Sequence, residues 1–196
     1  MSGVPVRLAV AGPGSISGPM IAPRFDLIRP DGDDRDRQVC ATCGFVNYVN
    51  PRTVAGSVVT AADGRILLCR RAIEPRRGFW TLPAGFMEER ETTREAAMRE
   101  AWEEARARIE IDALLAVYDI PRISQVQMMF RARLAEPAFE AGPESLEVAL
   151  FDWDEIPWKE LAFPSVVWAL RHWDGVRGQD GFAPFGNPDG VEAMVR

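Results

Sequence analysis

Apolar residues gather along the chain in five short runs that predict the strands of a β-sheet. The first two runs flank Ala62-Asp63-Gly64, and an Asp-Gly pair between apolar runs is a strong signal for a β-hairpin. Val, Ile, Leu and Met dominate these runs, which is typical of strands that helices cover on both faces. The predicted strands are residues 54–61, 65–70, 109–120, 125–134 and 146–153.

Two segments predict helices. Thr92 and Glu95 form a capping box, and residues 95–106 contain no Gly or Pro, so we expect a helix of about four turns there. Residues 163–173 predict a closing amphipathic helix, with Pro164 near its first turn. The apolar residues of the first helix are expected to pack on the sheet. They are Met98, Ala101, Trp102 and Ala105.

The order of these elements predicts a central domain of the α/β class, residues 50–175, with an appended segment at each end. Residues 1–49 begin with many Gly, Pro and Ser residues and continue with a charge-dense run. Residues 176–196 are rich in Gly, Pro and Asp, so we expect this C-terminal tail to be loosely held.

Composition and charge argue against several classes of protein. With 47% hydrophobic and 27% charged residues among 196, the chain is of the globular type. The longest stretch without a charge, residues 8–23, contains prolines and glycines and is too short to span a membrane. A net charge of −6 argues against binding to duplex nucleic acid. Three cysteines and the lack of an export signal favour the cytoplasm.

Carboxylates are concentrated on the first predicted helix. Glu100, Glu103 and Glu104 stand at positions i, i+3 and i+4, which fall on one face of a helix. Like charges at this spacing repel one another, so we expect a cation to bind there. Mg²⁺ is a hard cation that takes oxygen ligands and meets this requirement. Arg99 can reach Glu95 and Glu103 at four-residue spacing and is expected to hold a carboxylate in place.

The spacing of this segment resembles the Nudix box, G-x5-E-x7-R-E-U-x-E-E-x-G-U, in which U is aliphatic. Gly85, Glu91 and the run that starts at Arg99 match it, but Arg106 stands where the family has its last glycine. That glycine sits at the helix end and can take a positive φ. Either Arg106 adopts the same conformation at a cost of about 1 kcal/mol, or the helix continues past it.

The resemblance implies both a fold and an activity. The fold is an α/β/α sandwich with a mixed sheet, and the activity is hydrolysis of the pyrophosphate bond in a nucleoside diphosphate linked to another moiety, with Mg²⁺ or Mn²⁺ as cofactor. The implied metal-site residues are Glu91, Glu100, Glu103, Glu104 and the carbonyl of Ala84 or Gly85. Glu144 and Glu147 are each a candidate for the catalytic base, a further metal ligand or an ordinary loop acid, and Glu100 is a further candidate base.

Arginines and aromatic residues near the box are candidates for substrate binding. Guanidinium groups suit phosphate oxygens, and aromatic rings stack on bases and flavins. The candidates are Arg70, Arg71, Arg76, Phe79 and Phe86. A solvated or acid-paired arginine and an aromatic ring in the core are the competing interpretations.

The chain from residue 40 to about residue 173 is similar to Nudix proteins that carry an N-terminal zinc ribbon. A ribbon needs two Cys-x-x-Cys pairs, but here Cys40 and Cys43 form the only one. We therefore expect a degenerate ribbon without zinc. Pro121 has the spacing found in ADP-ribose hydrolases of the family, which favours ADP-ribose or FAD as substrate and AMP as a product. These relatives are commonly dimers, so a homodimer is expected.

Two alternative functions stay open at this point. One is a house-cleaning pyrophosphohydrolase that acts on nucleoside triphosphates, which the box alone does not distinguish. The other is a nucleotide-sensing module whose box has lost its activity, although Arg99, Glu100, Glu103 and Glu104 are all present.

Overall fold

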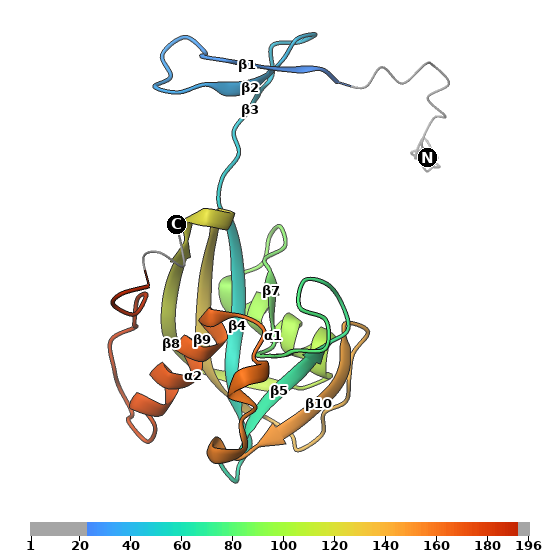
Figure 1. The fold of residues 1–196 in the computed structure, drawn as a ribbon, viewed down its shortest axis with the longest axis vertical. Helices are drawn as coiled ribbons and strands as arrows, with labels where there is room; N and C mark the ends of the chain where they lie inside the picture. The colour runs from blue at the N-terminus through green and yellow to red at the C-terminus, as the bar shows by residue number, and fades with distance from the viewer. Residues whose placement is uncertain (1–22, 192–196) are drawn as a thin grey trace, which may run out of the picture. The chain divides into compact units, whose positions relative to one another are not determined.

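The computed structural model describes residues 23–191 and separates the chain into two compact units, with the boundary between Val49 and Asn50. The first unit holds a three-stranded antiparallel sheet in the order β1-β2-β3 (Figure 1). Among residues 23–49 only Cys40 is buried, so this unit has almost no core of its own. Its strands are β1 Phe25–Ile28, β2 Arg37–Cys40 and β3 Val46–Asn47.

The second unit contains a seven-stranded sheet with two α-helices. The strand order is β10-β5-β4-β9-β8, β6 pairs with β5, and β7 pairs with β4. Strands β4 and β9 run parallel while the other pairs run antiparallel, so the sheet is mixed. The elements are β4 Arg52–Thr60, β5 Ile66–Arg71, β6 Trp80–Thr81, β7 Ala84–Phe86, α1 Thr93–Ala105, β8 Ile109–Ile120, η1 Pro121–Ile123, β9 Gln125–Leu134, β10 Ser145–Phe151, η2 Trp153–Glu155, η3 Trp158–Glu160 and α2 Pro164–Gly175.

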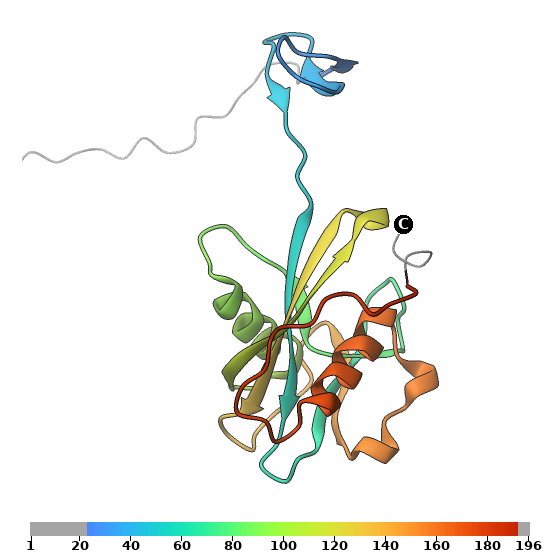
Figure 2. The ribbon, with the colours of Figure 1, turned by 90° about the vertical axis from the view of Figure 1, so that its left-hand side faces the viewer.

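Helices α1 and α2 cover opposite faces of the sheet (Figure 2). Helix α1 contributes mainly alanines to its side of the core, so its backbone can lie close to the sheet. Helix α2 is amphipathic, as predicted, and buries Val166, Trp168, Ala169, Leu170 and Trp173. No helix in residues 23–191 is long and apolar enough to cross a membrane. The expected α/β/α sandwich with a mixed sheet is confirmed.

The strand predictions agree closely with the structure. Strands β8 and β9 have the predicted bounds, and the other three predicted strands differ by one or two residues at their ends. The predicted hairpin turn between β4 and β5 is present, but these strands pair directly only through Thr60 and Ile66. Beyond that point β4 pairs with β7 and β9, whereas β5 pairs with β6 and β10.

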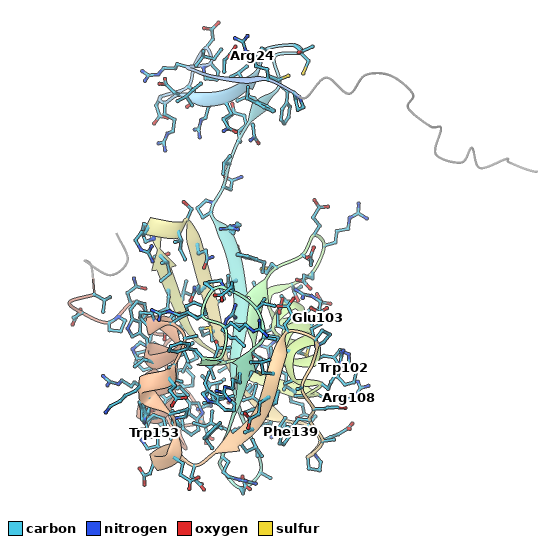
Figure 3. All side chains as sticks on the ribbon, turned by 45° about the vertical axis from the view of Figure 1, so that its right-hand side comes forward. Arg24, Trp102, Glu103, Arg108, Phe139 and Trp153 are labelled. Atoms are coloured by element: carbon cyan, nitrogen blue, oxygen red, sulfur yellow. The ribbon has the colours of Figure 1, made fainter. Side chains whose placement is uncertain are left out.

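Helix α1 begins with the predicted capping box, in which Thr92 accepts from the backbone N–H of Glu95 and Glu95 accepts from that of Thr92. It ends at Arg106, which takes the left-handed conformation with φ 48° and ψ 23°. Arg106 therefore takes the positive φ of the family's glycine, and the helix does not continue past it. The expectation that Met98 and Trp102 face the sheet is wrong, because both are exposed. The guanidinium of Arg108 lies 4.9 Å from the centre of the Trp102 ring instead (Figure 3).

The C-terminal tail packs on the domain as far as it is described, so the expectation of a loosely held tail is wrong for residues 176–191. Phe185 forms backbone hydrogen bonds with Leu115 and Val117 of β8. Its ring stacks on His172 of α2 at 4.2 Å between centres, and His172 in turn hydrogen-bonds the hydroxyl of Tyr118. An apolar side chain thus joins the tail to the core under α2.

We expect Phe185→Ala to lower the free energy of unfolding by about 2–3 kcal/mol, somewhat less than the loss of a fully buried phenylalanine. The matched control is Phe45→Ala, which removes an exposed ring in the N-terminal unit. Urea unfolding followed by tryptophan fluorescence measures both. A stability of the Phe185 variant equal to that of the control would show that the tail contributes nothing to the core.

Candidate active site

A cleft of about 560 Å³ runs along α1 and is lined by residues of β7, β9, α1 and the start of α2. It contains the three box glutamates that lie on α1, and six glutamates line it in total against three arginines. The charged lining residues are Glu74, Glu88, Glu100, Glu103, Glu104, Glu144, Arg71, Arg99 and Arg122. The cleft is therefore strongly acidic, and an anionic ligand needs additional positive charge to enter it.

Arg99 holds the acidic residues of the cleft in place. Its Nη1 donates to Glu100 at 2.8 Å and to Glu103 at 2.9 Å, and two of its nitrogens donate to the carboxylate of Glu91 at 2.8 and 3.0 Å. Its Nη2 also donates to the carbonyl of Phe86 at 2.9 Å. The expected contact with Glu103 is present. The expected contact with Glu95 is wrong, because that side chain is used in the capping box.

Glu100 and Glu104 lie on the buried face of α1, whereas Glu103 is exposed toward the cleft. Glu104 accepts a hydrogen bond of 3.1 Å from the backbone N–H of Ala84. Burial raises the pKa of Glu104 to about 8, although this hydrogen bond favours the charged form. Burial also raises the pKa of Glu100, against the influence of Arg99. Both carboxylates thus lack enough positive charge around them.

Gly85 leaves the space that the carboxylate of Glu100 fills. A Cβ atom on Gly85 would lie 2.3 Å from the carboxylate carbon and from one oxygen of Glu100, which is far closer than van der Waals contact. Any side chain at this position would push the carboxylate away from β7. The first glycine of the box therefore has a steric role here.

The loop between β9 and β10 is attached to the end of α1. The backbone N–H of Glu140 donates to Ala105 O and that of Gly142 donates to Glu104 O, so the loop satisfies two carbonyls at the helix end. A Cβ atom on Gly142 would lie 1.7 Å from the carbonyl oxygen of Glu103. Glu144, two residues further on, lines the cleft. The loop thus ties the position of Glu144 to that of the box glutamates.

The structure brings some of the remaining candidates into the cleft and leaves others outside. Arg71 and Phe86 line it. Arg71 stacks over Phe163 at 5.2 Å, and Arg52 lies 4.6 Å over the ring of Phe86. Five candidates do not line it: Glu91, which binds Arg99; Arg70 and Glu147, which form an ion pair at 3.5 Å; and Arg76 and Phe79, which stack on each other at 5.3 Å.

Several residues of the cleft were missed by sequence reasoning. Gln125 and Gln127 project from β9, and Phe163 and Trp168 come from the segment that begins α2. They are far from the box along the chain, so its spacing says nothing about them. The only signal was the alternation of polar and apolar residues in Gln125-Val-Gln-Met128, at the start of the strand.

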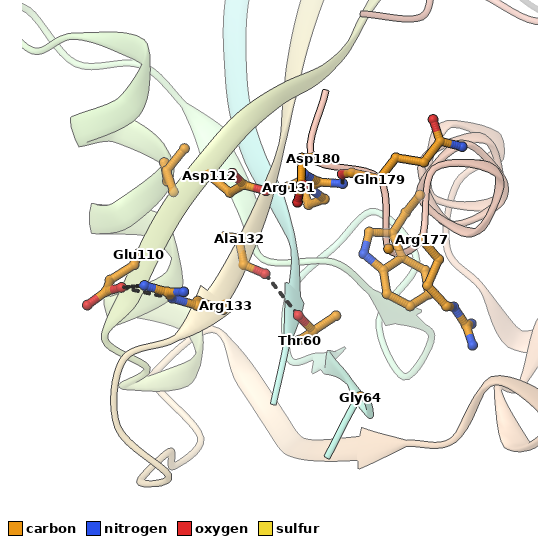
Figure 4. A pocket seen from close by; sticks show the side chains of 13 residues that line it. Thr60, Gly64, Glu110, Asp112, Arg131, Ala132, Arg133, Arg177, Gln179 and Asp180 are labelled. Atoms are coloured by element: carbon orange, nitrogen blue, oxygen red, sulfur yellow. Dashed lines mark hydrogen bonds and ion pairs between the residues drawn. The ribbon is translucent and has the colours of Figure 1, made fainter. Parts of the chain in front are cut away.

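A second hollow of about 690 Å³ lies beside β8, β9 and the end of α2 (Figure 4). No residue of α1 lines it. Two of its arginines are already paired with acids, Arg133 with Glu110 and Arg131 with Asp112. This hollow is separate from the acidic cleft and offers no comparable cluster of carboxylates.

The Cys40 and Cys43 thiols are both free, and no third metal-binding side chain joins them among residues 23–49. Backbone N–H groups of Cys43 and Thr42 lower the pKa of Cys40. Within residues 23–191 no three His, Cys, Asp or Glu side chains are already arranged around a metal position, and Arg99 engages both Glu100 and Glu103.

The second unit matches a known family. The model of the NUDIX domain covers residues 50–170. A MutT-like protein of Streptomyces ambofaciens is 35% identical over 126 residues, which are 64% of this chain and 77% of that protein. An ADP-ribose pyrophosphatase of Methanocaldococcus jannaschii is 32% identical over 120 residues, 59% of this chain and 69% of that protein.

A solved structure of a NUDIX hydrolase from Nitrosomonas europaea is also similar, with 44% identity and a TM-score of 0.78. The match covers 87% of this chain and 97% of the other. With more than half of its length matched by the family model, the chain belongs to the NUDIX domain family. It is an enzyme of the pyrophosphohydrolase class, which hydrolyses pyrophosphate linkages.

The contact at Gly142 predicts a strong effect of one added methyl group. Because a Cβ there would overlap the carbonyl of Glu103, Gly142→Ala should displace the loop from the helix end and lower kcat by about tenfold or more. The control is Gly181→Ala, where the added Cβ meets no atom within 4 Å. Steady-state kinetics with thermal unfolding of both variants is the measurement. Equal kcat in the two variants would contradict the role assigned to the loop.

The raised pKa of Glu104 predicts how the stability of the metal-free protein depends on pH. The unfolded chain loses this proton near pH 4.3, whereas the folded protein keeps it until about pH 8. The free energy of unfolding therefore falls as the pH rises from about 5 to 8. Glu104→Gln should remove the share of this fall that comes from the Glu104 carboxyl. Unfolding in urea with EDTA at several pH values measures it, with Glu110→Gln as control. Parallel curves for the wild type and the Glu104 variant would contradict the prediction.

Proposed function

We propose that this enzyme hydrolyses the pyrophosphate bond of an ADP-linked compound, ADP-ribose or FAD, to AMP and the corresponding second phosphate, with Mg²⁺ or Mn²⁺ as cofactor. The observation that carries the proposal is the set of three glutamates that α1 presents to one acidic cleft. The name of the Methanocaldococcus relative supports ADP-ribose as the substrate.

The residues of the cleft fit a hard divalent cation. All three donors are carboxylates, and oxygen ligands are what Mg²⁺ and Mn²⁺ prefer. The raised pKa values of Glu100 and Glu104 reflect burial with too little positive charge nearby, which a cation would supply. Because Gly85 has no side chain, the carboxylate of Glu100 can lie close to the backbone of β7. A donor set of this kind is the expected one for such an ion.

Glu100, Glu103 and Glu104 are the proposed ligands, together with the carbonyl of Ala84 or Gly85. When bound, the ion neutralises phosphate oxygens and lowers the pKa of an attacking water. Glu91 orients Arg99 through two hydrogen bonds, and Arg99 in turn holds Glu100 and Glu103 at the cleft. Glu91 and Arg99 are therefore proposed as positioning residues.

We assign the catalytic base to Glu144. It is exposed and lines the cleft, so it can accept a proton from water there. Glu147 lies outside the cleft and is paired with Arg70, which argues against the same role. Glu100 is less suitable because Arg99 already binds it.

Arg71 and Phe86 are the proposed substrate contacts among the original candidates. Arg71 has no carboxylate partner within ion-pair distance among the described residues, and its charge acts on Glu104 from close by. Its Nε donates to the carbonyl of Pro75 at 2.8 Å, which leaves the two Nη groups to bind phosphate oxygens. Phe86 is 43% exposed in the cleft and can pack against an apolar part of the substrate.

A substrate screen tests the activity. Wild-type enzyme with Mg²⁺ is incubated with ADP-ribose, FAD, NADH, coenzyme A and nucleoside triphosphates, and products are identified by mass. We expect AMP from ADP-ribose or FAD, and no product when EDTA replaces Mg²⁺. A preference for triphosphates with pyrophosphate as product would instead favour the house-cleaning alternative, to which the MutT-like relative points.

Glu103→Gln and Glu104→Gln should each lower kcat on the order of 100- to 1,000-fold, because each removes one charged oxygen donor without changing the size of the side chain. Glu110→Gln, an exposed acid outside the cleft, is the control. Circular dichroism shows whether the variants are folded. Near-normal turnover of a folded Glu103 or Glu104 variant would overturn the assignment of the site.

A further inference from the structure

The part of the cleft on β9 has a chemical character different from that of the part beside α1. Gln125, Gln127 and Met129 alternate along β9 and so project from the same face of the sheet into the cleft. The Nε2 of Gln127 donates to the Oε1 of Gln125 at 3.1 Å. This part of the cleft is thus lined by two linked neutral amides.

The two amides are half-buried and retain hydrogen-bonding capacity. Their mutual bond uses one N–H of Gln127 and one oxygen lone pair of Gln125. Within residues 23–191 no other hydrogen bond involves either side chain, so the oxygen and the second N–H of Gln127, together with the amino group of Gln125, are left for a ligand or water. Because polar groups among apolar neighbours are costly to leave unpaired, this arrangement favours a ligand with complementary groups.

Apolar side chains line the same cleft as the amides. Trp168, 8% exposed, and Phe163 come from the segment that begins α2, and Ile120 follows from β8. A site with apolar walls and a few polar groups is typical for a flat heterocycle, because the walls take the ring faces and the polar groups read its edge.

The register of the sheet sets the spacing between the amides and the glutamates. Gln127 pairs with Val54 of β4, and Val54 pairs with Phe86 of β7. Two strand spacings, about 10 Å, therefore separate Gln127 from β7, whose Ala84 binds Glu104. A phosphate group near the glutamates and a ring edge beside Gln127 are thus within the span of one nucleotide, in which a ribose and the width of the base lie between the phosphate and the ring edge.

We propose that Gln127, linked to Gln125, binds the edge of the adenine ring and makes this enzyme selective for adenine nucleotides. This rests on the proposed function for the identity of the full substrate. The amide of glutamine presents one acceptor and one donor side by side, which suits the amino group and adjacent ring nitrogen of adenine. Arg122, which would suit guanine, lies at the exposed margin of the cleft.

Binding of nucleotide products tests the proposal without catalysis. Calorimetric titration of the wild-type protein in the presence of Mg²⁺ with AMP, GMP, IMP and ribose 5-phosphate, none of which contains a pyrophosphate bond, should give the tightest binding for AMP, by about tenfold over ribose 5-phosphate. Gln127→Leu should bind AMP and ribose 5-phosphate equally. The control is Gln38→Leu, an exposed glutamine of the N-terminal unit, which should bind as the wild type does.

Steady-state kinetics gives a second measurement. With ADP-ribose, Gln127→Leu should raise KM about tenfold while kcat changes less than twofold, because the ring lies away from the reacting phosphorus. Wild-type binding of GMP as tight as AMP, or an unchanged preference in the Gln127 variant, would overturn the proposal. If ADP-ribose is not a substrate at all, the proposed function fails, while the titrations still decide whether an adenine site exists.

Discussion

Two carboxylates, Glu100 and Glu104, lie on the face of α1 that packs against the sheet, and their negative charge must be balanced inside the protein. Removing a carboxylate from water costs several kcal/mol unless it is paired. The structure supplies the guanidinium of Arg99 to Glu100, the backbone N–H of Ala84 to Glu104, and the charge of Arg71, which acts on Glu104 without an ion pair. This is less than the two charges require, and their raised pKa values follow from the deficit. The other residues of the site hold these two carboxylates in position.

Backbone geometry provides most of that support. Alanines on α1 let the helix lie close to the sheet, and Gly85 gives the carboxylate of Glu100 room beside β7. At the other end of the helix, Gly142 brings the loop of Glu144 into contact with the last turn. Charged groups are therefore positioned by contacts that only small residues permit. The amides of Gln125 and Gln127 on β9 line another part of the same cleft. The phosphates and the ring of the substrate are therefore assigned to different parts of it.

The sequence predicted those parts that depend on local pattern. The bounds of β8 and β9, the capping box and the three glutamates that α1 presents to the cleft follow from spacing along the chain. Contacts between distant segments were not accessible in this way. Arg99 binds Glu91, eight residues away in a loop, rather than Glu95 one turn away. Trp102 is apolar yet exposed, because alanines already fill the interface between α1 and the sheet. The guanidinium groups of Arg106 and Arg108 lie over its ring instead. The homodimer and the cytoplasmic location stay predictions.

The most direct test of the account is a crystal structure with Mn²⁺ and a non-hydrolysable ADP-ribose analogue, with data collected at a wavelength at which manganese scatters anomalously. The account predicts an anomalous peak bonded to carboxylate oxygens of Glu100, Glu103 and Glu104, with a phosphate of the analogue as a further ligand. An analogue bound in the cleft with no manganese near these side chains, and with Arg99 still their only cationic partner, would contradict it.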